Sequence, residues 1–146
     1  LETYTVDGKP KELLVHRKGS TRCFGPGHPE VPKKYQSVGQ PVIIGGSMET
    51  GSYLLAGAES GETFGSTMHG SGRTMSRTQA RKQFNGAEVQ KKMLEKGIYV
   101  NAVSLKGLAE EVGDAYKNVD DVVNVMELAG VSKKVVRLKP IGNVKG

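Results

Sequence analysis

One histidine of this 146-residue chain stands among small residues and directly before basic ones. Residues 64–73 read FGSTMHGSGR, which places Gly70 and Gly72 shortly after His69. Glycines at such positions allow backbone N–H groups to converge on an anion. An imidazole beside that anion could attack a phosphorus atom or give a proton to a leaving group. A glycine-rich turn with an incidental histidine would have the same letters, so the segment alone leaves both interpretations open.

The basic residues that follow could bind the same anion. Residues 73–84 contain no helix breaker and many good helix formers, which predicts a helix. If that helix began near Gly72 or Arg73, its positive N-terminus would face the anion. Arg73 and Arg77 are four residues apart, so on a helix they would share a face and could both reach phosphates.

Three other segments are candidate ligand sites, each with a simpler interpretation. Residues 45–52 (GGSMETGS) are either a site for a base or phosphate or an ordinary connection between two strands. Residues 17–22 (RKGSTR) are either a phosphate clamp or a solvated basic loop. Lys145 stands one position from the end of the sequence, where chains are commonly frayed.

The sequence shows no pattern typical of a metal site. It has three histidines and one cysteine, without an HExxH, a CxxC or a carboxylate–histidine pattern at ligand spacing. The spacing of His16, His28 and His69 does not indicate a shared metal, and His28, between Gly27 and Pro29, is expected in a loop. We therefore expect no metal ligand in this chain. A Walker loop and a KxDG-like lysine nucleophile are also missing from the sequence.

The charges are unevenly distributed along the chain. The net charge is +6, but residues 73–97 contain seven Lys or Arg against two Glu, and residues 98–132 contain two Lys against six acids. The basic block is either a solvated helical face or a surface for a polyanion such as nucleic acid. The single cysteine, Cys23, excludes an internal disulfide and is typical of a reducing, cytoplasmic compartment. No apolar run approaches the roughly 20 residues that span a bilayer, so no membrane contact is expected.

A mixture of strands and helices must position these residues. Strands are expected over residues 3–6, 11–16, 41–44, 52–56, 98–103 and 133–138, the first two joined at Asp7-Gly8 as a hairpin. Helices are expected over residues 73–84, 87–96 (capped by Asn85) and 119–129, and a loop over residues 17–32. Because no regular β-α-β alternation appears, the sequence predicts an α+β fold, with residues 1–146 in a single domain.

Motifs along the chain, in order, resemble the RtcB family, the 3′-phosphate RNA ligases of tRNA splicing and RNA repair. They are HRKGSTR at 16–22, PGHPEVP at 26–32, GQPV at 39–42, GSM at 46–48, ETFGST at 62–67, HGSGRTMSR at 69–77, GIYV at 97–100, AYKNVD at 115–120 and KPIG at 139–142. The similarity extends from about residue 6 to residue 146, so it is far more specific than any one motif.

The resemblance implies a chemistry and a set of site residues. Such ligases attack GTP with a histidine in the presence of manganese, pass GMP to an RNA 3′-phosphate or opened 2′,3′-cyclic phosphate, and join that end to a 5′-hydroxyl. His69 matches the histidine that carries the covalent GMP. The guanylate pocket would comprise Ser47, Met48, Ser52, Gly70, Ser71, Gly72, Tyr116 and Lys145, the last two contacting the base. Phosphate-binding positions of the family match Lys18, Arg73 and Arg77.

The resemblance also implies what this chain does not supply. The family's manganese ligands lie N-terminal to the matched region, and the sequence begins with Leu1 instead of Met. We expect the chain to be the C-terminal, guanylate-binding part, inactive alone and dependent on the N-terminal part of the ligase. The implied partners are tRNA halves or other RNA with the ends named above, and an archease-type activator. The alternative is a non-catalytic fragment that binds nucleotide or RNA.

Some residues depart from the family pattern. Glu49 stands where the family usually has glycine, and Gly45 where it often has proline; Met68 and Ser71 are smaller changes, and the chain is two residues shorter before Glu62. A carboxylate 4 Å from a phosphate would repel it by about 1–4 kcal/mol, depending on solvent exposure. Glu49 is therefore the departure expected to weaken nucleotide binding.

Overall fold

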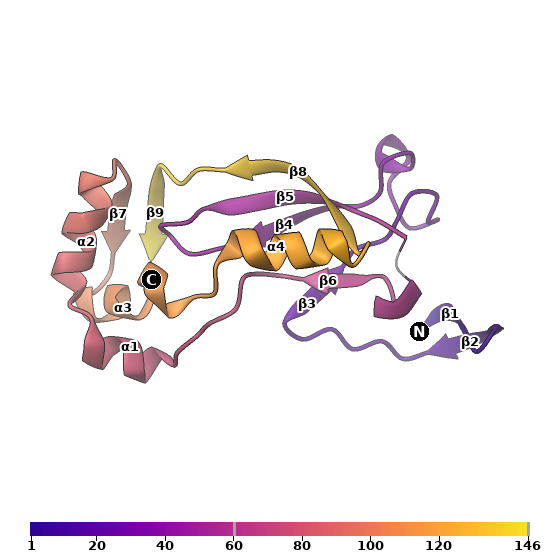
Figure 1. Cartoon of the computed structure of the whole chain (residues 1–146), viewed down its shortest axis with the longest axis horizontal. Coiled ribbons are helices and arrows are strands. Elements are labelled where there is room, and N and C mark those ends of the chain that lie inside the picture. The colour runs from indigo at the N-terminus through magenta and orange to yellow at the C-terminus, as the bar shows by residue number, and fades with distance from the viewer. Residues whose placement is uncertain (60, 146) are drawn as a thin grey trace.

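The computed structural model describes residues 1–59 and 61–145, which form an α+β fold as the sequence predicts (Figure 1). The strands are β1 (Glu2–Val6), β2 (Lys9–Leu13), β3 (Ser20–Arg22), β4 (Pro41–Gly45), β5 (Ser52–Gly57), β6 (Ser66–Met68), β7 (Tyr99–Ala102), β8 (Ser132–Leu138) and β9 (Gly142–Lys145). The α-helices are α1 (Arg77–Gln83), α2 (Gly86–Glu95), α3 (Leu105–Glu110) and α4 (Val119–Leu128), with short 3-10 turns at Lys33–Tyr35, Gly61–Thr63 and Gly113–Ala115. Among the helices described, none has the length and apolar character needed to span a bilayer.

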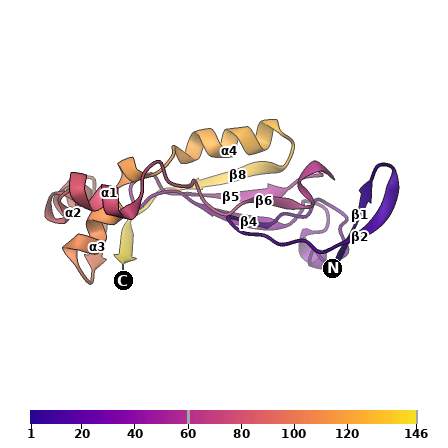
Figure 2. The same cartoon turned by 90° about the horizontal axis from the view of Figure 1, so that it is seen from below.

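The middle of the molecule is an antiparallel sheet of β4, β5 and β8, with α4 along one face (Figure 2). Val42 and Ile44 are buried and alternate with exposed residues along β4, because successive side chains of a strand point to opposite faces. They form a core cluster with Leu55 of β5 and with Val119 and Val123 of α4. The helix predicted over residues 119–129 from its apolar spacing thus corresponds to α4, which covers one face of the sheet.

A second core cluster lies at the end of the molecule formed by α1, α2, α3 and β7 (Figure 1). Leu108 of α3 is fully buried in it, beside Val89 and Met93 of α2. Asn85 caps α2 as predicted, with its side-chain oxygen accepting from the Ala87 N–H at 2.9 Å. Two cores therefore stand on either side of the segments that carry the candidate site.

The remaining strands form three two-stranded sheets. Asp7 and Gly8, with φ of 53° and 74°, join β1 to β2 in the predicted hairpin. β3 pairs with β6 in antiparallel fashion, and β7 pairs with β9 in parallel. Local sequence patterns predict neither β3, which lies inside the expected loop 17–32, nor β9, nor the capped helix α3. Each of the two strands pairs with a strand more than 40 positions away, so local sequence carries little signal for it.

The helix predicted over residues 73–84 begins four residues later than expected. α1 starts at Arg77 because Ser76 caps it, the Ser76 hydroxyl accepting from the Gln79 N–H at 3.2 Å. Arg73 lies ahead of the helix and forms an isolated β-bridge with Tyr116. The prediction of a helix N-terminus at Gly72 or Arg73 is therefore wrong, and so is the shared helical face of Arg73 and Arg77.

The burial of Leu108 predicts a large effect of truncating it. Its side chain is 0% exposed, so Leu108→Ala should lower the free energy of unfolding by about 2–5 kcal/mol through lost burial and an unfilled cavity. Leu128→Ala removes the same atoms from a residue that is 89% exposed and should change stability by about 0.5 kcal/mol or less. Urea unfolding followed by circular dichroism measures both. Equal effects of the two substitutions would contradict the assignment of α3 to the core.

Candidate functional site

The loop that carries the histidine is held against the end of the central sheet. His69 directly follows β6 and is exposed, while Gly70 forms a parallel bridge with Gly45, the last residue of β4. The Ser71 N–H donates to the Gly45 carbonyl at 2.9 Å. The His69 side chain is thus accessible, and the backbone of the two residues after it is held by hydrogen bonding to Gly45.

The 45–52 loop is a closed turn at the same place. The Gly46 N–H donates to the Gly51 carbonyl at 2.9 Å, and a Cβ on Gly46 would lie 2.5 Å from that oxygen, so only glycine fits. The Ser47 hydroxyl accepts from the N–H groups of Glu49 and Thr50 at 3.2 and 3.1 Å. Ser52 pairs with Gly45, and Met48 is buried in the core cluster around Leu108. Ser47 and Met48 therefore shape the turn as well as lying beside the histidine loop.

The residues after the histidine loop cross to the segment that contains Tyr116. The Lys117 N–H donates to the Gly72 carbonyl at 3.0 Å, and the Thr74 N–H donates to the Ala115 carbonyl at 2.9 Å. These bonds flank the Arg73–Tyr116 bridge. Residues 70–74 thus connect the 45–52 loop on one side with Tyr116 on the other.

The C-terminal tail is an ordered strand over its described residues. β9 pairs with β7 so that Lys145 lies opposite Ala102, and the Lys145 carbonyl accepts from the Val103 N–H at 3.0 Å. The Asn143 side-chain amide donates to the Met48 carbonyl at 3.2 Å. The interpretation of Lys145 as a frayed end is therefore wrong, because a parallel ladder fixes its backbone.

The carboxylate of Glu111, which no sequence motif marks as a site residue, joins these side chains. The Tyr116 hydroxyl donates to Glu111 Oε2 at 2.6 Å, and the Lys145 ammonium lies 3.5 Å from the same oxygen. Arg73 Nη1 lies 3.6 Å from Glu111 Oε1 and donates to the Tyr116 hydroxyl at 2.9 Å. The Arg73 guanidinium also lies over the Tyr116 ring, 4.7 Å from its centroid. We call Glu111, Arg73, Tyr116 and Lys145 the Glu111 network.

The ionisation of this network follows from its contacts. Burial by itself would raise the pKa of Glu111, but the hydrogen bond from Tyr116 and the charges of Lys145 and Arg73 outweigh it, so that pKa lies below its usual value. Burial, and then the hydrogen bond to the Glu111 carboxylate, raises the pKa of Tyr116. Glu111 is therefore an anion at neutral pH, and Tyr116 is a neutral hydroxyl that donates to it.

The arginines of the basic block are engaged by acids. Arg77 Nε lies 3.5 Å from Glu110 Oε2 and 3.8 Å from Glu111 Oε1, and Arg81 Nη1 lies 3.3 Å from Glu110 Oε1. The Arg73 guanidinium donates to the Glu110 carbonyl at 2.6 Å. Two glutamates of the acidic block thus face three arginines of the basic block. The only sequence signal for this pairing is that two adjacent glutamates, Glu110 and Glu111, follow a segment rich in arginine.

Glu49, the departure expected to repel phosphate, has a cationic partner. Its carboxylate is paired with the Lys96 ammonium, which raises the pKa of Lys96. Its side chain also lies against Gly113, where an added Cβ would meet Glu49 Oε2 at 2.3 Å. Local neutralisation by Lys96 reduces the repulsion expected from Glu49 alone.

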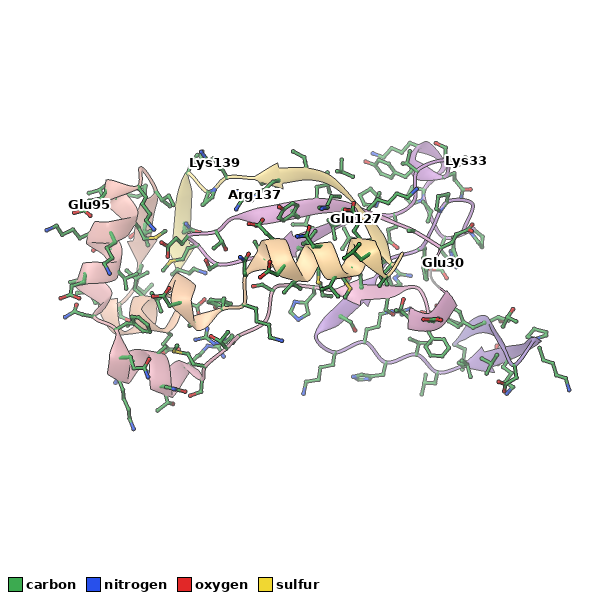
Figure 3. The ribbon with its side chains drawn as sticks, viewed as in Figure 1. Glu30, Lys33, Glu95, Glu127, Arg137 and Lys139 are labelled. Atoms are coloured by element: carbon green, nitrogen blue, oxygen red, sulfur yellow. The ribbon has the colours of Figure 1, made fainter. Side chains whose placement is uncertain are left out.

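A hollow of about 610 Å³ adjoins Tyr116, and its volume lies within the range of small-molecule sites. Glu49, Tyr116, Lys117 and Arg137 line it, and His69 is not among its described lining residues. Arg137 lies near the end of β8, and Lys139 lies where the chain leaves β8 for β9 (Figure 3).

The remaining predicted residues lie around the site. Lys18 precedes β3, whose first residue pairs with Met68, so Lys18 and His69 leave the β3–β6 ladder at the same end. His28 stacks on Phe24 with ring centroids 3.8 Å apart and is a loop residue, as predicted. Within residues 1–59 and 61–145, no group of three or more His, Cys, Asp or Glu is placed to hold a metal ion.

The chain matches known proteins along its length. Residues 1–146 match the family described as tRNA-splicing ligase RtcB. The tRNA-splicing ligase RtcB of Pyrococcus abyssi is 53% identical over 148 residues, which covers 100% of this chain and 16% of that protein. For Thermococcus kodakarensis the identity is 53%, covering 100% of this chain and 31% of the relative; for Archaeoglobus fulgidus it is 56%, covering 99% and 30%. The chain spans less than a third of the length of each of these relatives.

The lowered pKa of Glu111 predicts how the network contributes to stability as pH changes. A carboxyl whose folded pKa lies below its unfolded value stabilises the fold fully above the unfolded pKa of about 4.3 and loses that contribution as pH falls through the folded pKa. At neutral pH, Glu111→Gln should cost about 1–3 kcal/mol by weakening hydrogen bonds to a charged group. The difference between the wild type and this variant should narrow below about pH 4.3. Urea unfolding across the pH range measures it, and a difference independent of pH would contradict the network.

Proposed function

The chain belongs to the tRNA-splicing ligase RtcB family, and on that premise we propose that it is the nucleotide-accepting part of a GTP-dependent RNA ligase. The observation that best supports the proposal is the course of residues 70–74. Directly after the exposed His69, these residues are hydrogen-bonded to Gly45 and to the 115–117 segment. The segment that follows the proposed nucleophile is therefore hydrogen-bonded to a small-residue turn on one side and to the backbone around Tyr116 on the other.

The chemistry proposed for His69 is nucleotidyl transfer. A neutral ring nitrogen of His69 attacks the α-phosphorus of GTP, so that an N–P bond forms, the P–O bond to pyrophosphate breaks, and the imidazole loses its proton. An oxygen of the RNA 3′-phosphate then takes the GMP and releases the histidine. Finally the 5′-hydroxyl of the second RNA end attacks the activated 3′-phosphate, forms the phosphodiester and expels GMP.

The pocket residues take complementary parts in this proposal. Gly70, Ser71 and Gly72 allow close approach of the phosphates to the backbone, and Ser47 and Ser52 line the neighbouring turn. Tyr116 and Lys145 contact the guanine base, which is supported by their convergence on the Glu111 carboxylate at 2.6 and 3.5 Å. Lys18, Arg73 and Arg77 remain the candidate phosphate ligands for RNA, and binding there requires Arg77 to exchange its carboxylate partners for phosphate.

Manganese does not fit the described part of this chain, which offers no three-residue cluster of metal ligands. We therefore derive no step through a metal from these residues and propose that the N-terminal part of the ligase supplies the ligands. The proposed partners are RNA ends with a 3′-phosphate or 2′,3′-cyclic phosphate and a 5′-hydroxyl, and an archease-type activator.

The His69 assignment predicts covalent labelling. The full-length gene product that contains this chain, given radioactive GTP and Mn²⁺, should form an acid-labile adduct that His69→Ala abolishes. His16→Ala and His28→Ala should keep substantial labelling, because in sequence neither histidine precedes a segment that is hydrogen-bonded to Gly45 and to residues 115–117. Persistent labelling of His69→Ala would show that another residue is the nucleophile. A wild-type protein that binds GTP or RNA but never labels would favour the alternative of a non-catalytic binding fragment.

The ion pairing of the arginines predicts which cations attract RNA. Lys82, Lys91 and Lys92 are exposed, and no described carboxylate lies within salt-bridge distance of them. Affinity for a 3′-phosphorylated single strand should fall with salt, each neutralised phosphate contributing about −0.7 to the log–log slope. Lys82→Gln, Lys91→Gln and Lys92→Gln should each make the slope less steep. Lys134→Gln should leave the slope unchanged, because Lys134 is already paired with Glu127 at 2.8 Å. Filter binding at several salt concentrations measures the slope, and a flat salt dependence would contradict the proposal.

A further inference from the structure

The Glu111 carboxylate uses both of its oxygens on residues from three separate segments of the chain. Oε2 accepts from Tyr116 and faces Lys145, while Oε1 faces Arg73 at 3.6 Å and Arg77 at 3.8 Å. Its side chain is only 20% exposed. Glu111 thus holds the two residues proposed to contact the base and, through Arg73, the segment that follows His69.

Local helix stability does not account for this carboxylate. Glu111 is the C-terminal cap of α3, directly after Glu110 in the last turn. Helix C-termini carry partial negative charge and favour cations, so two adjacent carboxylates there are unfavourable for the helix. Burial adds a further cost to the charged form. The compensating contacts of Glu111 come from Arg73, Tyr116 and Lys145, outside its own helix.

We propose that Glu111 is a positioning residue that orients Tyr116 and Lys145 for the purine base, an inference that rests on the proposed function. The long side chain of a lysine samples many rotamers when it has no partner, and an anionic partner restricts them before the ligand arrives. The Tyr116 hydroxyl accepts from Arg73 and donates to Glu111, so its orientation is also set. Nucleotide then binds to side chains that are already in place.

The contact between Glu111 and Lys145 also bears on which purine base is preferred. An ammonium has three N–H donors and no acceptor, so Lys145 keeps donors for a ligand while one faces Glu111. The edge of guanine offers the O6 and N7 acceptors, whereas adenine presents an amino donor in place of O6. Glu111 therefore favours a 6-oxopurine over adenine by holding a pure donor at the base, and it contacts the nucleotide only through Tyr116 and Lys145.

The test compares GTP kinetics of the full-length gene product and matched variants. Glu111→Gln should raise the apparent KM for GTP in guanylylation about tenfold, the scale of one lost charge-assisted contact. The rate at saturating GTP should stay within about threefold, because His69 is unchanged. Selectivity for GTP over ATP should fall. Glu110→Gln removes the same charge one residue away, where the partners are Arg77 and Arg81, and should leave KM within about twofold.

Variants of the positioned residues separate this role from a general loss of structure. In a Tyr116→Phe, Lys145→Met background, Glu111→Gln should add less than about twofold to KM, since its effect passes through those side chains. A full tenfold effect in that background would overturn the proposal. If Glu111→Gln fails to fold, Lys145→Met alone, at a residue that is only partly buried, should raise KM similarly, and an unchanged KM would overturn the proposal.

Failure of the proposed function gives a different result. A wild-type protein that is never labelled by GTP overturns the ligase proposal, and this role with it. Normal wild-type labelling with an unchanged KM in Glu111→Gln overturns only the positioning role. Equal losses in Glu111→Gln and Glu110→Gln would also overturn it, because the charge at α3 and not the contact to Tyr116 and Lys145 would then decide affinity.

Discussion

The backbone of residues 70–74 is the constraint on which the rest of the site depends. On one side the Ser71 N–H is bonded to the Gly45 carbonyl, and on the other the Gly72 carbonyl accepts from Lys117. One bond reaches the central sheet under α4, and the other reaches the segment after α3 (Figure 1). The site thus lies where the two cores meet, and displacement of either core would move His69 relative to Tyr116.

Part of the basic run is paired with carboxylates before any polyanion is bound. The two carboxylates of Glu110 and Glu111 form ion pairs with Arg73, Arg77 and Arg81, so these three arginines do not form an open cationic surface. The same contacts hold side chains of the proposed pocket at fixed positions. Net charge and its distribution along a sequence describe long-range attraction, whereas the state of each cation depends on which carboxylate the fold places within a few ångströms.

Local sequence rules predicted the elements whose signals are local. Asp7-Gly8 predicted its hairpin, Asn85 predicted the cap of α2, and the apolar spacing after residue 119 predicted α4. The His69 segment and its family resemblance could also be identified from the sequence, because the motif is contiguous. The start of α1 was misplaced because Ser76 competes as a cap with the helix-forming residues before it.

By itself, the sequence determined the family, the mixed α+β class, the identity of the candidate nucleophile and the small-residue loops around it. Tertiary structure alone decided which of these residues meet. β9 places Lys145 by pairing with β7, and Glu111 joins Lys145 to Tyr116 and Arg73 across more than 70 positions of chain. Such contacts depend on strand register and helix packing between distant segments, and no local propensity encodes them.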